Sequence, residues 1–433
     1  MTDMLRPSDE GYEPERRGFQ TGFQHSPAVI VGAVDEHDVC AAVAHAADAG
    51  LGVSVQATGH GTSGLNDGGV LISTRRMDGV QVFPARQEAR IEAGVQWRQV
   101  IAAAAPHGLA PLSGSSPTVG AVGYALGGGL GLLGREFGFA ADHVLSLDVV
   151  TADGKLRSVD ASNDPELFWG LRGGRDHLGV VTSMTIRLFP VERIHGGGLF
   201  FDVSHAREVI SAFRDLTAQA PETLTASLGM VRYPPVALFP EPLRDRHVLH
   251  FRFASTSEPE RLIAPVRAAA PAILDQVRDM PFTESGSVYN DPEFPHSYYG
   301  NNVLLSSFPA EAADAVRRLC GPAAPVPVIL DVRHLGGALS RPPAEPNCVG
   351  HREAQYIVRV LSPLATAELA DVRRVHRRIF SALAEWTVGQ APNFRYGPVE
   401  ELGPVYDEPS SARLRALKEQ HDPSGLFRAL PEA

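Results

Sequence analysis

The sequence predicts an α+β protein whose N-terminal domain is followed by a second domain, an antiparallel sheet covered by helices. Two observations support this fold class. A strand, a helix and another strand follow one another over residues 28–57. Residues 191–384 then alternate strand-like runs with amphipathic helical stretches, and Pro190 separates the two regions. We therefore expect domains at 1–190 and 191–384, with a C-terminal segment at 385–433.

The first domain opens with a buried strand over Ala28–Val34. A helix follows over Asp35–Ala49, because Val39, Val43 and Ala46 recur on one face and a glycine ends it. The next strand covers Gly52–Ala57. Later elements of this domain are expected, in order, as strands at 69–73, 79–83 and 89–92, a helix at 96–106, and strands at 143–151 and 180–188.

The second domain has four clear strand patterns and four helical ones. The strands are expected at 198–203, 224–232, 247–254 and 356–361, and the helices at 207–219, 259–270, 310–319 and 365–384. Strands and helices that alternate in this way suggest helices packed on one face of an antiparallel sheet.

Composition excludes several classes of function. The net charge of −11 argues against nucleic-acid and anionic-membrane partners, and no apolar run approaches the length of a membrane span. The polar start, Met1–Arg17, lacks the apolar core of a signal peptide, so we expect a cytoplasmic protein. The three cysteines have no CxxC spacing, and HExxH, G-x-S-x-G and phosphate-loop motifs are missing. We therefore expect no metal site.

A histidine stands among glycines in Val55–Gly64, just after the second expected strand. Glycine tolerates positive φ and lets the backbone approach a ligand closely. The pattern therefore predicts a loop that wraps a ligand, with His60 facing it.

A second glycine-rich tract, Ser113–Gly131, follows about fifty residues later. Glycine destabilises regular structure by roughly 0.5–1 kcal/mol per position relative to alanine. Binding of a close-fitting cofactor is the natural candidate for the interaction that offsets this cost. The first alternative interpretation of this glycine tract is a nicotinamide-binding Rossmann site. It requires a strand before the tract and a helix after it, and the sequence indicates neither convincingly.

Together these motifs resemble the FAD-linked oxidases of the vanillyl-alcohol-oxidase superfamily, in particular the berberine-bridge-enzyme-like branch. The resemblance implies a two-subdomain FAD-binding domain of the PCMH type, to which 385–433 returns, and a separate substrate-binding domain. The motifs that carry it are Pro27–Ile30, Ala57–His60, Ser116–Gly120, Gly127–Gly131, Arg135–Gly138, Ala141–His143, Leu167–Gly174, Gly179–Ser183 and Leu417–Phe427.

The resemblance also implies how FAD is held. His60 would bond covalently to the flavin, whereas the cysteine that often makes a second link is replaced by Ser116, so we predict a single attachment. Leu167–Gly174 would form turns that face the cofactor. The residues expected to bind FAD are Thr58, Gly59, His60, Gly61, Thr62, Ser63, Ser113, Gly114, Ser116, Thr118, Val119, Gly120, Gly123, Tyr124, Gly127, Gly128, Gly129, Leu130, Gly131, Gly179, Val180, Val181 and Asn393.

Two catalytic roles follow from the same resemblance. Val119 occupies the position that governs access of dioxygen, where a small side chain is associated with oxidases. The usual catalytic tyrosine stands two residues before an Asn-Phe pair, but Ala391 occupies that position here. Tyr396, two residues after the pair, is the replacement candidate for the catalytic base. Other candidates are Tyr299, His334, His351 and Tyr356. The Asn-Tyr pair that often contacts the flavin before the last helix is replaced by Ser410-Ser411.

The predicted function is an FAD-dependent oxidase that removes a hydride from a C–OH or C–N centre of a small organic molecule and reduces O₂ to H₂O₂. Two alternatives remain: a cyclase that uses FAD as a scaffold without redox turnover, and a dehydrogenase with another electron acceptor. The oligomeric state and the substrate are not readable from the sequence.

Overall fold

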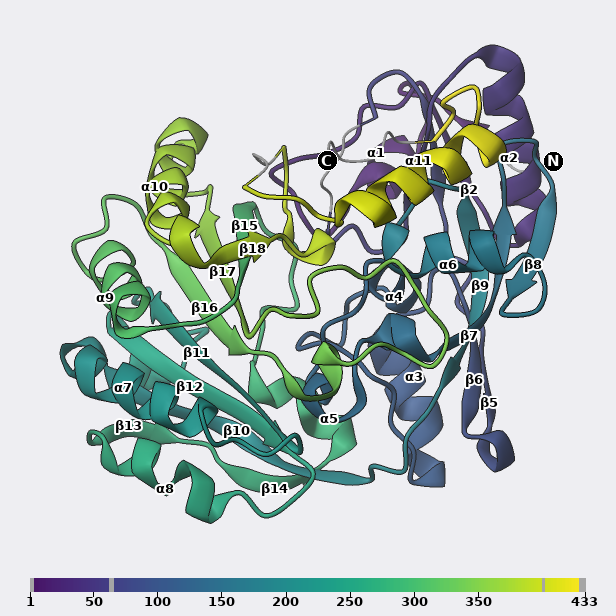
Figure 1. Cartoon of the computed structure of the whole chain (residues 1–433). Helices are drawn as coiled ribbons and strands as arrows, with labels where there is room; N and C mark the ends of the chain where they lie inside the picture. The colour runs from purple at the N-terminus through teal and green to yellow at the C-terminus, as the bar shows by residue number, and fades with distance from the viewer. Residues whose placement is uncertain (1–3, 62–65, 399–401, 428–433) are drawn as a thin grey trace.

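The computed structural model describes residues 4–61, 66–398 and 402–427, which form three sheets surrounded by helices (Figure 1). The strand orders are β1-β2-β4-β3, β5-β6-β9-β7-β8, and β13-β10-β12-β11-β16-β17-β15-β18 with β14 also paired to β10. The predicted α+β class is therefore confirmed.

The first sheet contains the predicted β-α-β opening. Strands β2 (Val29–Gly32), β4 (Val70–Ser73) and β3 (Val53–Gln56) run parallel, and β1 (Met4–Leu5) joins them antiparallel. Helix α2 (Glu36–Ala49) follows β2 as expected. The Asp35 side chain caps its first turn, and Gly50 ends it at φ 64°. The short helix α1 (Tyr12–Arg16) precedes β2.

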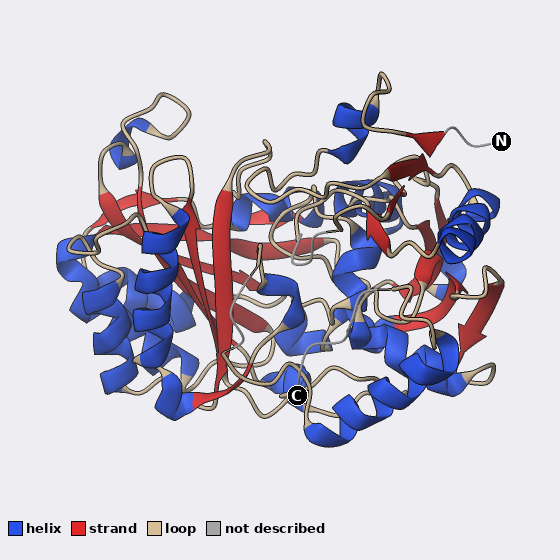
Figure 2. Ribbon diagram, turned by 90° about the horizontal axis from the view of Figure 1, so that it is seen from above, coloured by secondary structure: helices blue, strands red, loops and turns tan. Residues whose placement is uncertain are grey.

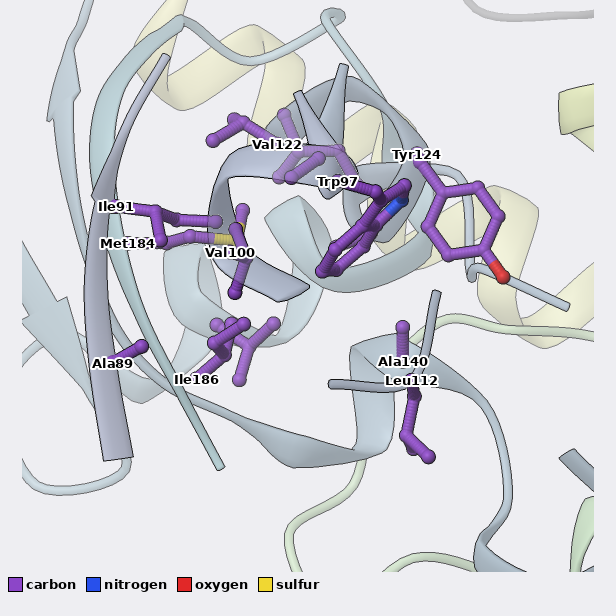
Figure 3. Packing of buried hydrophobic residues seen from close by; sticks show 14 of the residues in the cluster. Ala89, Ile91, Trp97, Val100, Leu112, Val122, Tyr124, Ala140, Met184 and Ile186 are labelled. Atoms are coloured by element: carbon purple, nitrogen blue, oxygen red, sulfur yellow. The ribbon is translucent and has the colours of Figure 1, made fainter. Parts of the chain in front are cut away.

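The second sheet is antiparallel. One face packs against the helices of its own core, and the other face packs in part, at Val150 and Val180, against α2. Its strands are β5 (Val80–Phe83), β6 (Glu88–Glu92), β9 (Val180–Arg187), β7 (Val144–Val150) and β8 (Leu156–Asp160). Figure 3 shows Ile91 and Met184 of this sheet packed with Val100 of α3 (Trp97–Ala104). In the same core the Tyr124 ring of α4 (Ala121–Leu126) lies edge-on to Trp97, with ring centroids 5.4 Å apart.

One prediction in this region is wrong. Leu167–Gly174 is not a set of turns that face a cofactor but the buried part of α6 (Pro165–Gly174), which is helical at first and is kinked at Arg172 and Gly173, whose backbone angles are not helical. Gly170 lets α6 pack closely, because a Cβ there would lie 2.7 Å from Leu178 and 2.9 Å from Leu417. The latter residue belongs to α11 (Glu408–His421), so the glycine serves helix packing.

The third sheet is antiparallel, as predicted, and four helices cover one of its faces (Figures 1 and 2). The alternating apolar residues of its strands, such as Phe251 and Val358, form one core with those helices. The helices are α7 (Ala206–Thr217), α8 (Glu260–Ala268), α9 (Ala310–Leu319) and α10 (Leu369–Ser381). The strands are β10 (Arg193–Asp202), β11 (Leu224–Arg232), β12 (His247–Ser255), β13 (Ala272–Asp275), β14 (Arg278–Pro281), β15 (Tyr298–Leu305), β16 (Ile329–His334), β17 (Tyr356–Pro363) and β18 (Thr387–Gly389).

The chain crosses between the two regions again near its end. Strand β18 pairs with β15, so the large sheet extends to Gly389, beyond the predicted boundary at 384. Helix α11 then lies beside α6 of the first domain (Figure 1), and Phe427 forms a bridge with Val53 of β3. The C-terminal segment thus lies against the first domain.

A buried arginine joins the two domains. Arg135, in the short helix α5 (Gly134–Phe137), donates hydrogen bonds to the carbonyl oxygens of Leu224, Leu335 and Ala220 in the second domain. Within the described residues, no helix combines the length and the apolar character needed to span a bilayer.

Candidate active site

A cavity of about 1080 Å³ lies where the two domains meet. The first domain contributes β3 with the histidine loop after it, and the tract around Ser116. The second contributes the face of β11, β12, β16 and β17 that the helices leave open. The cavity brings together these predicted site residues: Thr58, Gly59, His60, Gly61, Gly114, Ser116, Val119, Gly120, Gly123, Tyr124, Leu130, Asn393 and Tyr396.

His60 is held from both sides of its ring. Its Nδ1 lies 3.0 Å from Thr58 Oγ1 and its Nε2 lies 3.1 Å from Thr118 Oγ1. The Phe19 ring stacks on the imidazole, with centroids 3.7 Å apart. Burial, helped by the nearby His296, lowers the pKa of His60 to about 3. The imidazole is therefore neutral at physiological pH and keeps a lone pair on one nitrogen.

The tract beside His60 continues this hydrogen-bonded arrangement. Ser116 Oγ lies 3.0 Å from Thr118 Oγ1, which in turn reaches His60. Val119 is partly buried on the cavity wall, and its carbonyl accepts a hydrogen bond from the backbone N–H of Trp97. The turn that carries these residues is thus fixed against α3.

The glycine tract divides into two parts with different surroundings. Gly120 and Gly123 line the cavity, and a Cβ on Gly123 would meet no atom within 4 Å. Gly127, Gly128, Gly129 and Gly131 are not part of this lining. A Cβ on them would instead meet Asn393, Val349, Ala140 and the Ser113 carbonyl, respectively. These four glycines permit close packing on their Cβ side, and the expectation that their backbone N–H groups face a pyrophosphate stays a prediction.

The remaining predicted cofactor residues have other positions. Ser113 and Thr118 are buried just behind the cavity wall. Gly179, Val180 and Val181 lie in and before β9, where a Cβ on the glycine would meet Val149, so they do not line the cavity. Thr62 and Ser63 fall outside the described residues.

Tyr396 is the candidate base that the structure brings to the cavity. Its backbone pairs with Gly300 of β15, and its ring lies edge-on to Tyr298 at 5.3 Å. Burial raises the pKa of Tyr396, and the charge of Arg359 opposes that rise. Ala391 only anchors the neighbouring loop, through backbone hydrogen bonds to the Asn302 side chain.

The other base candidates lie elsewhere. Tyr299 packs in the apolar core beneath the sheet, and Tyr356 bonds to Thr217 at 2.7 Å. His334 contacts Arg135, and His351 lies over Gly389. None of the four belongs to the cavity lining.

Sequence reasoning missed a charged cluster on the cavity floor. Arg252, Arg333 and Arg359 surround Asp331, and all four side chains are buried or nearly so. Asp331 accepts hydrogen bonds from Arg252 at 2.5 Å and from Arg359 at 2.8 Å. A sequence signal was available, because these charges alternate with apolar residues in His247–Ser255, Ile329–His334 and Tyr356–Pro363.

Tyr298 and Arg175 were missed as well. The Tyr298 hydroxyl donates to the His60 carbonyl at 2.9 Å. Arg175 donates to the carbonyls of Gly61 and Pro392, at 3.4 and 2.7 Å, and so connects the histidine loop with the segment that carries Asn393. Tyr298 thus holds the histidine loop against the second domain, and Arg175 holds it against the C-terminal segment.

The residues present fit an elongated cofactor. The wall runs from Gly425–Phe427 and Asn66–Gly69, beside β3, through the histidine loop to Tyr396. A Cβ on Gly123 would meet no atom within 4 Å, so a ligand in the cavity can approach the backbone of helix α4 at this residue. The volume slightly exceeds the usual range for a single ligand site, which leaves room for a cofactor and a substrate. Within the described residues, no cluster of His, Cys, Asp or Glu is arranged to hold a metal ion.

Comparison with known proteins agrees with this fit. Residues 27–160 match the family model described as "FAD binding domain". The chain is 34% identical over 193 residues to (R)-6-hydroxynicotine oxidase of Paenarthrobacter nicotinovorans, an alignment that spans 44% of this chain and 42% of that relative. It is 24% identical over 434 residues to an uncharacterised FAD-linked oxidoreductase, YgaK, of Bacillus subtilis, covering 97% and 94% of the two chains.

Solved structures share the whole fold. The 6-hydroxy-D-nicotine oxidase of Arthrobacter nicotinovorans superposes with a TM-score of 0.84 at 24% identity, covering 99% and 96% of the chains. The berberine-bridge-enzyme-like protein 1 of Physcomitrella patens gives 0.85 at 18%, covering 99% and 97%. Glucooligosaccharide oxidase of Acremonium strictum gives 0.83 at 18%, covering 99% and 96%.

The fold and the matched domain define the class as an FAD-binding protein grouped with FAD-linked oxidoreductases. The solved structures show a shared fold, and they include a berberine-bridge-enzyme-like protein, in agreement with the resemblance that the motifs suggested.

Proposed function

We propose that this protein is an FAD-dependent oxidase acting on a C–OH or C–N centre of a small organic molecule. When bound, FAD would supply the redox chemistry: it would be the acceptor for the substrate hydride, and O₂ would be reduced to H₂O₂. The observation that carries the proposal is the neutral His60 imidazole on the wall of a cavity that also contains Tyr396. One residue would hold the cofactor, and the other would act on the substrate.

His60 is proposed to hold FAD through a covalent bond. A protonated imidazole has no lone pair to offer, and burial keeps this one neutral. Hydrogen bonds between the ring nitrogens of His60 and the hydroxyl groups of Thr58 and Thr118 orient the ring. One of these hydroxyl groups donates to the unprotonated nitrogen, and this hydrogen bond must break when the nitrogen bonds to the flavin. The glucooligosaccharide oxidase neighbour carries 6-S-cysteinyl, 8α-N1-histidyl FAD. Here Ser116 offers a hydroxyl in place of a thiolate, so we propose the histidyl link alone.

Tyr396 is proposed as the base that takes the proton from the substrate O–H or N–H. Its phenolate would be stabilised by the guanidinium of Arg359, whose charge already opposes the effect of burial on the tyrosine pKa. Hydrogen bonds to Gly300 fix the backbone of Tyr396, so the phenol has a defined position.

Val119 supports the choice of an oxidase over a dehydrogenase. It lies on the cavity wall in a turn held by Trp97 and Ser116, and its short side chain leaves space that a larger residue would fill. We propose that this space admits O₂.

Two measurements test the proposal. Acid-precipitated protein should stay yellow, and protein with His60→Ala should release its flavin into the supernatant. A panel of alcohols and amines should then be screened for bleaching of the flavin absorbance without air, followed by recovery and peroxide formation when air is admitted. Bleaching that air does not reverse would favour the dehydrogenase. Product formed without bleaching would favour the cyclase.

A further inference from the structure

The cavity floor carries charged side chains in a fixed row. In the large sheet, Ser227 of β11 pairs with Arg252 of β12 on one side and with Arg333 of β16 on the other. Because paired residues in neighbouring strands point to the same face, both arginines point away from the helices and into the cavity. Arg359 of β17 pairs with Asp331 and lies on the same face.

Cations outnumber carboxylates on this floor. Asp331 is the carboxylate that contacts the cluster directly: its Oδ1 lies 2.5 Å from Arg252 Nη2, and its Oδ2 lies 2.7 Å from Arg359 Nη2. Asp291, also on the cavity wall, accepts a hydrogen bond from Ser115 and acts on Arg359 through its charge. Two carboxylates against three guanidinium groups leave an excess of one positive charge.

Of the three arginines in this cluster, Arg333 has the most donor atoms without a hydrogen-bond partner among the described residues. It is 2% exposed, and its Nη1 donates to the Leu130 carbonyl at 3.1 Å. Its Nε and Nη2 have no hydrogen-bond partner within residues 4–61, 66–398 and 402–427, and Nη2 lies 3.8 Å from Asp331, too far for a hydrogen bond. Arg252 Nε is likewise without a partner. Leaving buried charged donors unpaired is costly, so the arrangement favours an added acceptor. The unpaired atoms themselves are covered, so an acceptor in the cavity would reach them through a small shift of the guanidinium groups.

The surroundings position these two arginines. Their guanidinium groups lie 4.3 and 4.8 Å from the centroid of one ring, that of Tyr289, whose hydroxyl is fixed by Ser227 at 2.8 Å. Gly229 leaves the room that Arg252 needs to reach Asp331, because a Cβ there would lie 2.7 Å from Arg252 Nη2. The free donors thus belong to side chains held by packing as well as by charge.

Resting on the oxidase function proposed above, we propose that the substrate carries a carboxylate and that Arg333 and Arg252 bind it. A carboxylate has the single negative charge that matches the excess on the floor. Its two oxygens match the planar fork of a guanidinium, which forms paired, charge-assisted hydrogen bonds. The substrate class is therefore an organic acid that also bears the C–OH or C–N centre to be oxidised.

The test is calorimetric titration of the purified FAD-containing protein with acids and their uncharged amides. Benzoate and benzamide, phenylacetate and phenylacetamide, and acetate and acetamide form matched pairs, and inorganic phosphate is a separate arm. At least one acid should bind ten-fold or more tightly than its amide. Arg333→Met, which keeps the length of the side chain without its charge, should remove that preference. Arg193→Met is the control, because Arg193 is an exposed partner of Asp279 in the same sheet and lies outside the cavity.

Other outcomes would overturn the inference. These are acids that bind no better than their amides, phosphate that binds more tightly than every acid, or an Arg333→Met protein that keeps the preference. A lowered flavin reduction potential with unchanged acid binding would assign Arg333 to the cofactor instead. If circular dichroism shows that Arg333→Met does not fold, the comparison of acids with amides on the unmodified protein still tests whether the cavity prefers a carboxylate. Binding needs no turnover, so an inactive protein that prefers acids would overturn the oxidase and keep the carboxylate site.

Discussion

Replacing Tyr396 by phenylalanine removes one oxygen from the cavity and the hydrogen bond of that oxygen with Arg359. The backbone pairing with Gly300 and the edge-on contact with the Tyr298 ring do not involve the hydroxyl, so the fold should persist. A positioned general base accelerates a reaction by about 10²–10⁴-fold. The variant should therefore lose about 3–5 kcal/mol of transition-state stabilisation, measured as kcat/KM for a substrate found by the bleaching screen.

The pH profile separates a base from a packing residue. Burial raises the pKa of Tyr396, so at neutral pH most of the phenol is protonated and kcat/KM should rise with pH towards that pKa. Tyr396→Phe should lose this rise. Tyr356→Phe is the matched control, because Tyr356 bonds to Thr217 outside the cavity and its loss should leave the profile unchanged. A Tyr396→Phe protein within three-fold of the original activity, with the same profile, would refute the assignment.

Two further predictions concern stability. Burial lowers the pKa of His376 to about 3, so the folded state resists protonation and stability should fall as pH drops from about 6.5 towards 3, by up to about 1.4 kcal/mol per unit. His376→Gln should flatten this fall in thermal denaturation, whereas the exposed His107→Gln should not; identical slopes would contradict the argument. Gly127→Ala should lower the melting temperature by an overpacking cost of about 1–3 kcal/mol, because its Cβ would overlap Asn393. Gly123→Ala, compared in flavin-free protein because the cofactor is proposed to lie beside it, has a Cβ that meets open space and should not; equal losses would refute the packing account.

Local signals in the sequence were enough to predict many elements of the fold. Helix α2 has an aspartate cap, an apolar face and a terminal glycine, and it forms over nearly the predicted residues. The bounds of β11 and α9 match the prediction because alternation and amphipathic spacing are properties of the segments themselves.

Glycine-rich segments were harder to interpret, because glycine density does not say what approaches the backbone. Gly123 faces open space, whereas Gly127 faces Asn393, which is distant in sequence. Gly170 and its neighbours looked like a turn, but packing against Leu178 and Leu417 makes them part of a helix. Tertiary contacts decided both cases.

The arginine cluster was missed for a different reason. The alternation of charged and apolar residues in β12, β16 and β17 is visible in the sequence and indicates strands with one polar face. Which strands are neighbours is set by the sheet order β12-β11-β16-β17, which brings Arg252 beside Asp331 across 79 positions. That order depends on long-range pairing, so the cluster could not be assembled from local patterns.

The central claim is that one histidine holds the flavin, and peptide mapping by mass spectrometry tests it most directly. Digestion of the purified protein should yield a flavin-bearing peptide in which fragmentation places the modification on His60, while the peptide with Ser116 remains unmodified. A flavin attached at another residue, or a His60 peptide that is always unmodified, would contradict the account.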